Sequence, residues 1–125
     1  TANIAMATLI DPDFRARLRA LNDKYAAGVP ALMQAIAQAQ ARCDSEGPRL
    51  EALTQLHRAL HAVAGSAATF GFAALGQECR RIEQLVRVQL NAPGRVLAEW
   101  PALSGQVETL LRWAERDAAA SHFSA

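Results

Sequence analysis

The sequence predicts an all-α fold, and three observations support this prediction. Alanine is the commonest of the 125 residues, followed by leucine and arginine, which also favour helices. No stretch alternates apolar and polar residues over the length of a strand. Glycine and proline divide the chain into long amphipathic segments with short connections, which is typical of an antiparallel up-and-down helix bundle.

The first part of the chain is expected to hold two helices. Asp11 and Pro12 form a start signal, with the aspartate as N-cap and the proline at the first helical position. A helix is therefore predicted over 12–27, and the Gly-Val-Pro sequence at 28–30 should break or kink it. A second helix is predicted over 30–43, before a loop. The apolar residues of the first helix recur at helical spacing at Phe14, Leu18, Leu21 and Tyr25.

Three further helices are predicted over 49–70, 73–90 and 96–119, with a tight turn at Gly71 between the first two. The helix over 49–70 has a narrow apolar seam suited to a bundle. This seam comprises Leu50, Leu53, Leu56, Leu60, Val63, Ala67 and Phe70. The last helix is expected to pack through Leu97, Leu103, Val107, Leu110, Leu111 and Ala114, with Trp100 and Trp113 as packing anchors.

The length suits one domain with a single core. We expect a tail over 1–10, the helical domain over 11–120 and a frayed tail over 121–125. The chain starts without methionine and lacks the pattern of a signal peptide, so we expect a processed chain or a domain of a larger protein.

Composition excludes several classes of function. Thirteen Lys and Arg residues oppose 12 Asp and Glu, and aromatic residues make up only 6%, which argues against nucleic-acid binding. Cys43 and Cys79 are too few for a disulfide framework and are interpreted as free thiols in a reducing compartment. No apolar run approaches the roughly 20 residues of a membrane span. No phosphate-binding glycine motif is present, so the chain is not expected to use ATP by itself.

His61 is the first candidate for chemistry. The helical period places it on the solvent-facing flank of the helix, away from the apolar seam. The next turns on this flank carry the small residues Ala64, Gly65 and Ala68, which would let a partner approach closely. A glycine within a helix costs about 1 kcal/mol relative to alanine, and exposure of the histidine is one reason to tolerate that cost.

Glu83 is expected to contact His61. The two residues lie equally far before and after the turn near Phe72, so antiparallel helices place them at the same height. The carboxylate could accept the Nδ1–H of His61 and leave Nε2 as a free nucleophile. No serine or cysteine is placed for activation by the histidine, which makes the histidine itself the nucleophile.

The residues of this hairpin form the pattern His61-x-x-x-Gly65-Ser66-Ala67, Phe70-Gly71, Leu75, Cys79, Ile82 and Glu83. This pattern resembles the histidine-containing phosphotransfer (HPt) domain of two-component phosphorelays. The resemblance covers roughly Leu53 to Arg87, and the predicted helices agree with it outside that range.

The resemblance implies a four-helix bundle core with an additional N-terminal helix. His61 would be phosphorylated on Nε2 and would relay the phosphoryl group between a histidine kinase, or its receiver domain, and an aspartate of a response regulator. The chain would be a phosphocarrier and not an enzyme, with no cofactor or metal of its own, since Mg²⁺ would belong to the receiver domain.

The resemblance also implies roles for the neighbouring residues. Glu83 would orient the histidine ring, Ser66 would contact the phosphoryl group, and Gly65 would allow the partner to approach. The partner-binding surface would comprise Ala64, Gly65, Ala68 and His57, with His57 as a solvated neighbour of His61. We expect a monomeric bacterial protein in the cytoplasm, either free or at the cytoplasmic end of a membrane-bound sensor kinase.

One position departs from the family pattern. The family usually has lysine three residues after the histidine, and this chain has Ala64 there. Arg58, one turn before His61, is the preferred substitute for the missing charge. Arg80 and Arg87 are further candidates.

Two alternatives remain open. The bundle could be an interaction module without chemistry, in which case replacing His61 with glutamine would leave its function intact. It could also bind a metal ion through His57 and His61, which form an HxxxH pair, although no third ligand is evident.

Overall fold

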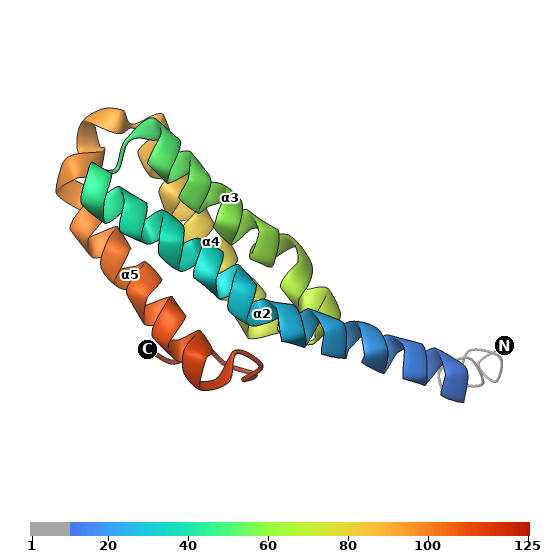
Figure 1. Ribbon diagram of the computed structural model, residues 1–125. Helices are drawn as coiled ribbons and strands as arrows, with labels where there is room; N and C mark the ends of the chain where they lie inside the picture. Colours follow the sequence, from blue (N-terminus) through green and yellow to red (C-terminus); the bar gives the residue numbers. More distant parts are fainter. Residues whose placement is uncertain (1–10) are drawn as a thin grey trace, which may run out of the picture.

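The computed structural model describes residues 11–125, and the tail predicted over 1–10 lies outside the described residues. The elements are α2 (Pro12–Glu46), α3 (Leu50–Ser66), η1 (Ala67–Phe70), α4 (Ala73–Asn91), η2 (Pro93–Arg95) and α5 (Val96–Asp117), where η denotes a 3-10 helix. Helices α2 and α4 each pack against both α3 and α5, and successive helices run antiparallel (Figure 1). The prediction of an all-α bundle of four helices is therefore confirmed.

The predicted division of the first part into two helices is wrong. One continuous helix, α2, includes Pro30, and the Asp11 side chain accepts a hydrogen bond of 3.0 Å from the backbone N–H of Asp13 at its start. Proline removes one helical hydrogen bond, which leaves the carbonyl of Ala26 without its donor. Both Ala26 and Pro30 are exposed, so water can reach this carbonyl. The helix bends and does not break (Figure 1).

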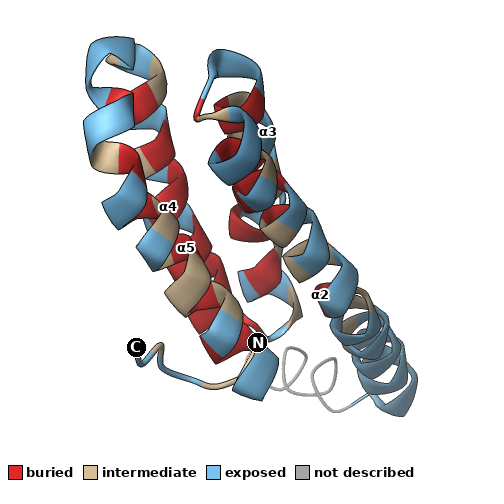
Figure 2. Cartoon of the chain, turned by 60° about the vertical axis from the view of Figure 1, so that its left-hand side comes forward, coloured by how far each residue is buried: buried red, intermediate tan, exposed pale blue. Residues whose placement is uncertain are grey.

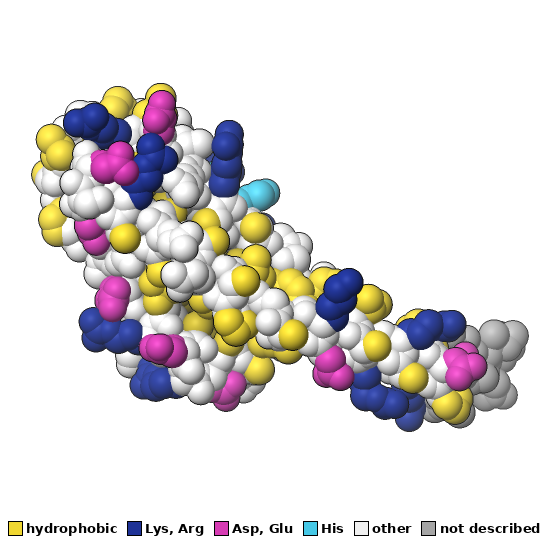
Figure 3. All heavy atoms as spheres, viewed as in Figure 1, with side chains coloured by type: hydrophobic (Ala, Val, Ile, Leu, Met, Phe, Trp, Pro, Cys, Tyr) yellow, Lys and Arg dark blue, Asp and Glu magenta, His cyan; other side chains and the backbone are white. Residues whose placement is uncertain are grey.

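Among residues 11–125 no separate helix precedes the four of the bundle, and the first part of α2 instead projects beyond the bundle (Figure 1). Its residues are exposed on all sides up to Leu21, so its predicted apolar face packs against no other described element (Figure 2). Apolar side chains are visible on this projection between charged ones of both signs (Figure 3). Partial burial begins at Asn22, and the ring of Tyr25 stacks on Phe70 with 4.9 Å between centroids.

The core lies between the four helices and contains most of the predicted seam (Figure 2). Trp100 and Trp113 are buried as expected, and the indole Nε1–H of Trp100 donates to Asp44 at 2.8 Å, which joins α5 to α2. Leu50 and Leu97 are exceptions, with 70% and 77% of their surface exposed. Each lies in the first turn of its helix, since α3 begins at Leu50 and α5 begins at Val96.

The helix predicted over 49–70 is not α-helical to its end, and the hairpin that carries the candidate site closes through a 3-10 helix and a tight turn. Helix α3 ends at Ser66, and the chain continues as the 3-10 helix η1. Gly71 then adopts φ 93°, a left-handed conformation that favours glycine. Gly76 permits the close packing of α4 on this turn, since a Cβ there would lie 3.3 Å from the Cβ of Ala67.

Both cysteines are free and buried. Burial raises the pKa of the Cys43 thiol to about 11 and that of the Cys79 thiol to about 12. Neither thiol is therefore suited to nucleophilic chemistry.

The end of the chain leaves the helical conformation after Asp117. In the segment predicted as a frayed tail, Phe123 packs edge-to-face on Trp113 with 5.2 Å between ring centroids. None of the helices in 11–125 combines the length and the apolar character that crossing a membrane requires.

Candidate functional site

His61 and Glu83 are in contact across the α3–α4 hairpin. The Nδ1 atom of His61 lies 2.8 Å from Oε1 of Glu83, as the equal spacing from the turn predicts. The His61 side chain is 66% exposed, whereas that of Glu83 is only 7% exposed. When Nδ1 carries its proton, it donates to the carboxylate, and Nε2 then has a free electron pair. Within 11–125, Nε2 has no hydrogen-bond partner.

The Glu83 carboxylate is shared by several groups. Its Oε1 atom lies 3.2 Å from Nε2 of His57 and 3.4 Å from a terminal nitrogen of Arg87, in addition to the contact with His61. A buried carboxylate needs such partners, because an unpaired charge in a protein interior is costly. Glu83 therefore joins His57 and His61 of α3 to Arg87 of α4.

The expectation that His57 is a solvated neighbour is wrong. Its side chain is only 19% exposed, and its ring lies parallel to that of His61 with 6.1 Å between centroids. Although its Nε2 is close to Glu83, the geometry is not that of a hydrogen bond, and the buried atom has no other partner. His57 lies one turn before His61, on the side of α3 that faces α4.

Burial lowers the pKa of His57 below its usual 6.5, and the positive charge of Arg87 and the neighbouring His61 act in the same direction. The Glu83 carboxylate opposes the shift only in part. The unfolded chain therefore binds a proton more readily than the folded one at this site. Stability should fall as the pH drops through 6.5 towards the lower pKa of the folded state.

We expect this loss to be visible in urea unfolding at pH values above and below 6.5. The variant His57→Gln cannot take up this proton, so its free energy of unfolding should fall less over the same range. Equal pH slopes for the wild type and the variant would contradict the assignment of this proton uptake to His57.

A shallow hollow adjoins the exposed His61 ring. Its volume is about 140 Å³, which is room for several water molecules and hence for a phosphoryl-sized anion. It is lined by His61, Ala64, Gly65, Arg80, Glu83, Gln84 and Arg87. Two arginines thus line the same hollow as the histidine.

Two predicted site residues lie elsewhere. Arg58, the preferred substitute for the missing lysine, does not line the hollow beside His61. It lines a different hollow, together with Arg42 of α2 and the first turns of α3. The hydroxyl of Ser66 donates to the carbonyl of Ala62 at 2.8 Å and is also hydrogen-bonded to the hydroxyl of Tyr25 at 2.9 Å. The Ser66 hydroxyl proton is therefore engaged within α3.

The small residues predicted as a partner surface differ in exposure. Gly65 and Ala68 are exposed, whereas Ala64 is buried and reaches the surface only where it lines the hollow. A Cβ added to Gly65 would meet nothing within 4 Å. Internal packing therefore does not require glycine at this position. Glycine is unfavourable in a helix, so the packing within the chain does not explain why it is present.

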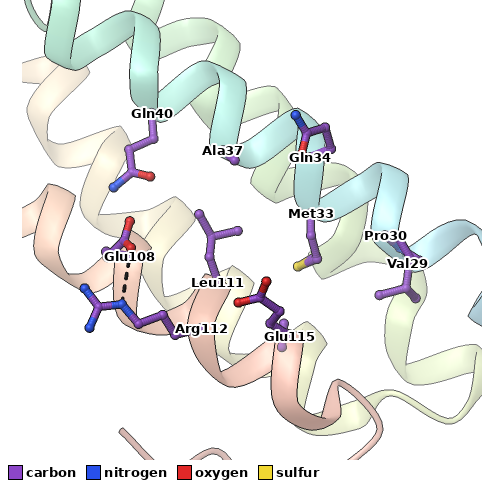
Figure 4. A pocket seen from close by; sticks show the side chains of 11 residues that line it. Val29, Pro30, Met33, Gln34, Ala37, Gln40, Glu108, Leu111, Arg112 and Glu115 are labelled. Carbon is purple, nitrogen blue, oxygen red and sulfur yellow. Dashed lines mark hydrogen bonds and ion pairs between the residues drawn. The ribbon is translucent and has the colours of Figure 1, made fainter.

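Another hollow, of about 490 Å³, lies between α2 and α5 (Figure 4). Met33 and Leu111 line it, and Glu108 forms an ion pair with Arg112 at its edge (Figure 4). None of the predicted site residues lines it. No group of three or more potential metal ligands occurs among the residues that the structure describes. The HxxxH pair of His57 and His61 thus has no third metal ligand in this part of the chain.

The fold and the site together define a class of protein. It is a four-helix bundle in which an exposed histidine on one helix is held by a buried carboxylate on the next. The family model of the Hpt domain matches residues 18–120, and the chain belongs to this family. Hpt domains are phosphocarrier modules of two-component signalling and not enzymes. No curated protein and no solved structure shows significant similarity to the chain.

Proposed function

We propose that this chain carries a phosphoryl group on Nε2 of His61 and relays it between a histidine kinase, or its receiver domain, and an aspartate of a response regulator. The contact between Nδ1 of His61 and Glu83 is the observation that supports this proposal most strongly. It leaves the second ring nitrogen at the surface, where a protein partner can reach it.

The transfer needs a positioned nucleophile more than acid–base catalysis. Neutral Nε2 attacks the phosphorus of an aspartyl phosphate, the N–P bond forms, and the O–P bond breaks to restore the donor carboxylate. The ring keeps its Nδ1 proton and so gains a positive charge, which the Glu83 carboxylate stabilises. Transfer to the next aspartate reverses these changes, and the Mg²⁺ needed at the aspartate belongs to the receiver domain.

The partner would dock on the exposed surface around Gly65 and Ala68. Gly65 has open space where a Cβ would lie, so its cost in helix stability is explained by an external partner and not by packing within the chain. A receiver domain is the partner that supplies the aspartate. His57 would act behind this surface, through Glu83.

The proposal is tested by incubating the chain with phosphoramidate, or with a phosphorylated receiver domain, and measuring its intact mass. We expect the addition of one phosphoryl group that is lost in acid and kept in alkali, as is typical of phosphohistidine. An acid-stable adduct, or no adduct from either donor in a folded helical chain, would contradict the proposal.

Glu83 should influence the rate of transfer more than the fold. Replacing it with glutamine keeps an acceptor for the Nδ1–H but removes the negative charge that stabilises the phosphorylated ring. We expect Glu83→Gln to accept the phosphoryl group about tenfold more slowly or worse, the effect typical of a lost orienting partner. Stopped reactions analysed by mass give this rate, and circular dichroism checks the fold. An unchanged rate would show that Glu83 has no part in the transfer.

The second candidate function is a helical interaction module without chemistry. The engagement of the Ser66 hydroxyl and the absence of lysine at position 64 favour it, because both remove expected phosphoryl contacts. This module would bind its receiver partner equally well with His61 replaced by glutamine, and neither form would take up phosphoryl.

A further inference from the structure

The hollow beside His61 contains one positive charge that no carboxylate neutralises. Among its lining residues, Arg87 forms an ion pair with Glu83 at 3.4 Å, so the carboxylate offsets the positive charge of Arg87. Arg80 forms no ion pair with any residue in 11–125. Its one hydrogen bond, of 3.2 Å, goes from a terminal nitrogen to the backbone carbonyl of Ala64.

This hydrogen bond places the Arg80 side chain on the α3 side of the hairpin. Ala64 lies one turn after His61, so the guanidinium is held beside the turn that follows the histidine. A guanidinium has five N–H donors, and a single carbonyl leaves most of them available. Arg80 is exposed on α4, so these donors can face an anion in the hollow.

A phosphoryl group on His61 would bring an anion to this place. Phosphoryl groups carry close to two negative charges near neutral pH, and arginine binds them through paired N–H donors. Glu83 is the one carboxylate that lines the hollow, and it is paired with His61 and Arg87. Arg80 is therefore the lining cation that is left for the phosphoryl oxygens.

We infer that Arg80 binds the phosphoryl group of phosphorylated His61 from α4 and so supplies the charge that is absent at position 64 of α3. This inference rests on the proposed function. The contact with the phosphoryl group is thereby assigned to Arg80 of α4, whereas the sequence alone favoured Arg58 of α3.

The test compares the wild type with Arg80→Gln at equilibrium with phosphoramidate, at a fixed ratio of phosphoramidate to ammonia. In this reaction Nε2 takes the phosphoryl group and ammonia leaves. We expect the equilibrium constant for phosphorylation to fall about tenfold in Arg80→Gln, the effect of one lost charge-assisted hydrogen bond. Intact mass gives the phosphorylated fraction.

A second readout separates binding from a merely structural role. The titration of the phosphoryl group, followed by phosphorus NMR, should shift to a pKa about one unit higher in Arg80→Gln, because the nearby cation favours the dianion. Arg80→Lys should restore both measurements in large part. The matched control Arg58→Gln removes an arginine from the other hollow and should resemble the wild type.

The remaining outcomes each overturn the inference. If Arg80→Gln matches the wild type in both readouts while His61 is phosphorylated, the inference fails and the proposed function stands. If Arg58→Gln shows the loss, the cation is Arg58. If Arg80→Gln lowers only the melting temperature of the unphosphorylated chain, Arg80 ties α4 to α3 and nothing more. If the wild type takes no phosphoryl group, the proposed function fails as well.

Discussion

Replacing His61 with glutamine should abolish the acid-labile phosphoryl adduct completely. Glutamine keeps a polar side chain on the surface of α3 but has no nitrogen with a free electron pair, so no N–P bond can form. The His61 side chain is 66% exposed, so its loss should leave the fold nearly unchanged. Intact mass after incubation with phosphoramidate measures the adduct, and circular dichroism measures the fold.

The chain offers matched controls for this experiment, since it contains only three histidines. His122→Gln removes an exposed histidine that follows α5 and is not part of the hairpin, so this variant should take up phosphoryl like the wild type. His57→Gln keeps the His61–Glu83 contact and should still accept a phosphoryl group. An adduct that persists in His61→Gln and disappears in either control would place the phosphoryl group on another histidine.

The largest loss of stability is expected for Leu60→Ala. Leu60 is fully buried, one residue before His61, and its truncation leaves a cavity between α3 and its neighbours. A substitution of this kind costs about 2–5 kcal/mol in the free energy of unfolding. Urea unfolding should show a lower midpoint with an unchanged slope, since the change affects stability and not the surface exposed on unfolding.

Leu50→Ala is the matched control, because it makes the same substitution in the same helix. Leu50 is 70% exposed, so its truncation should change the free energy of unfolding by no more than about 0.5 kcal/mol. The sequence pattern places both leucines on one seam, and only their burial differs. Equal losses in the two variants would contradict the structure at the start of α3.

Local spacing was sufficient to predict the hairpin and the central contact of the site. The seam residues Leu53, Leu56 and Leu60 follow the helical period, and all three are buried in the structure. The contact between His61 and Glu83 follows from equal distances to the turn, because antiparallel helices with a short connection have a nearly fixed register. The roles that we propose for these two residues await the experiments above.

Some features of α2 and of the helix ends could not be read from such patterns. Pro30 is a signal for a break, yet α2 continues because the affected carbonyl is exposed to water. Leu50 has the correct spacing for the seam, but it is the first residue of α3 and is exposed. Burial depends on which side chains of the neighbouring helices cover a residue, and spacing within one helix does not contain that information.

The surroundings of Glu83 were decided by the tertiary structure. Spacing places His57 and Arg58 on either side of the turn before His61, but it does not say which side faces α4. The packing of the helices decides this: His57 contacts Glu83 of α4, and Arg58 shares a hollow with Arg42 of α2. The sequence by itself thus determined the two helices of the hairpin and which two residues meet across it. Packing between the helices decided that Arg80 and Arg87, and not Arg58, share the hollow with His61.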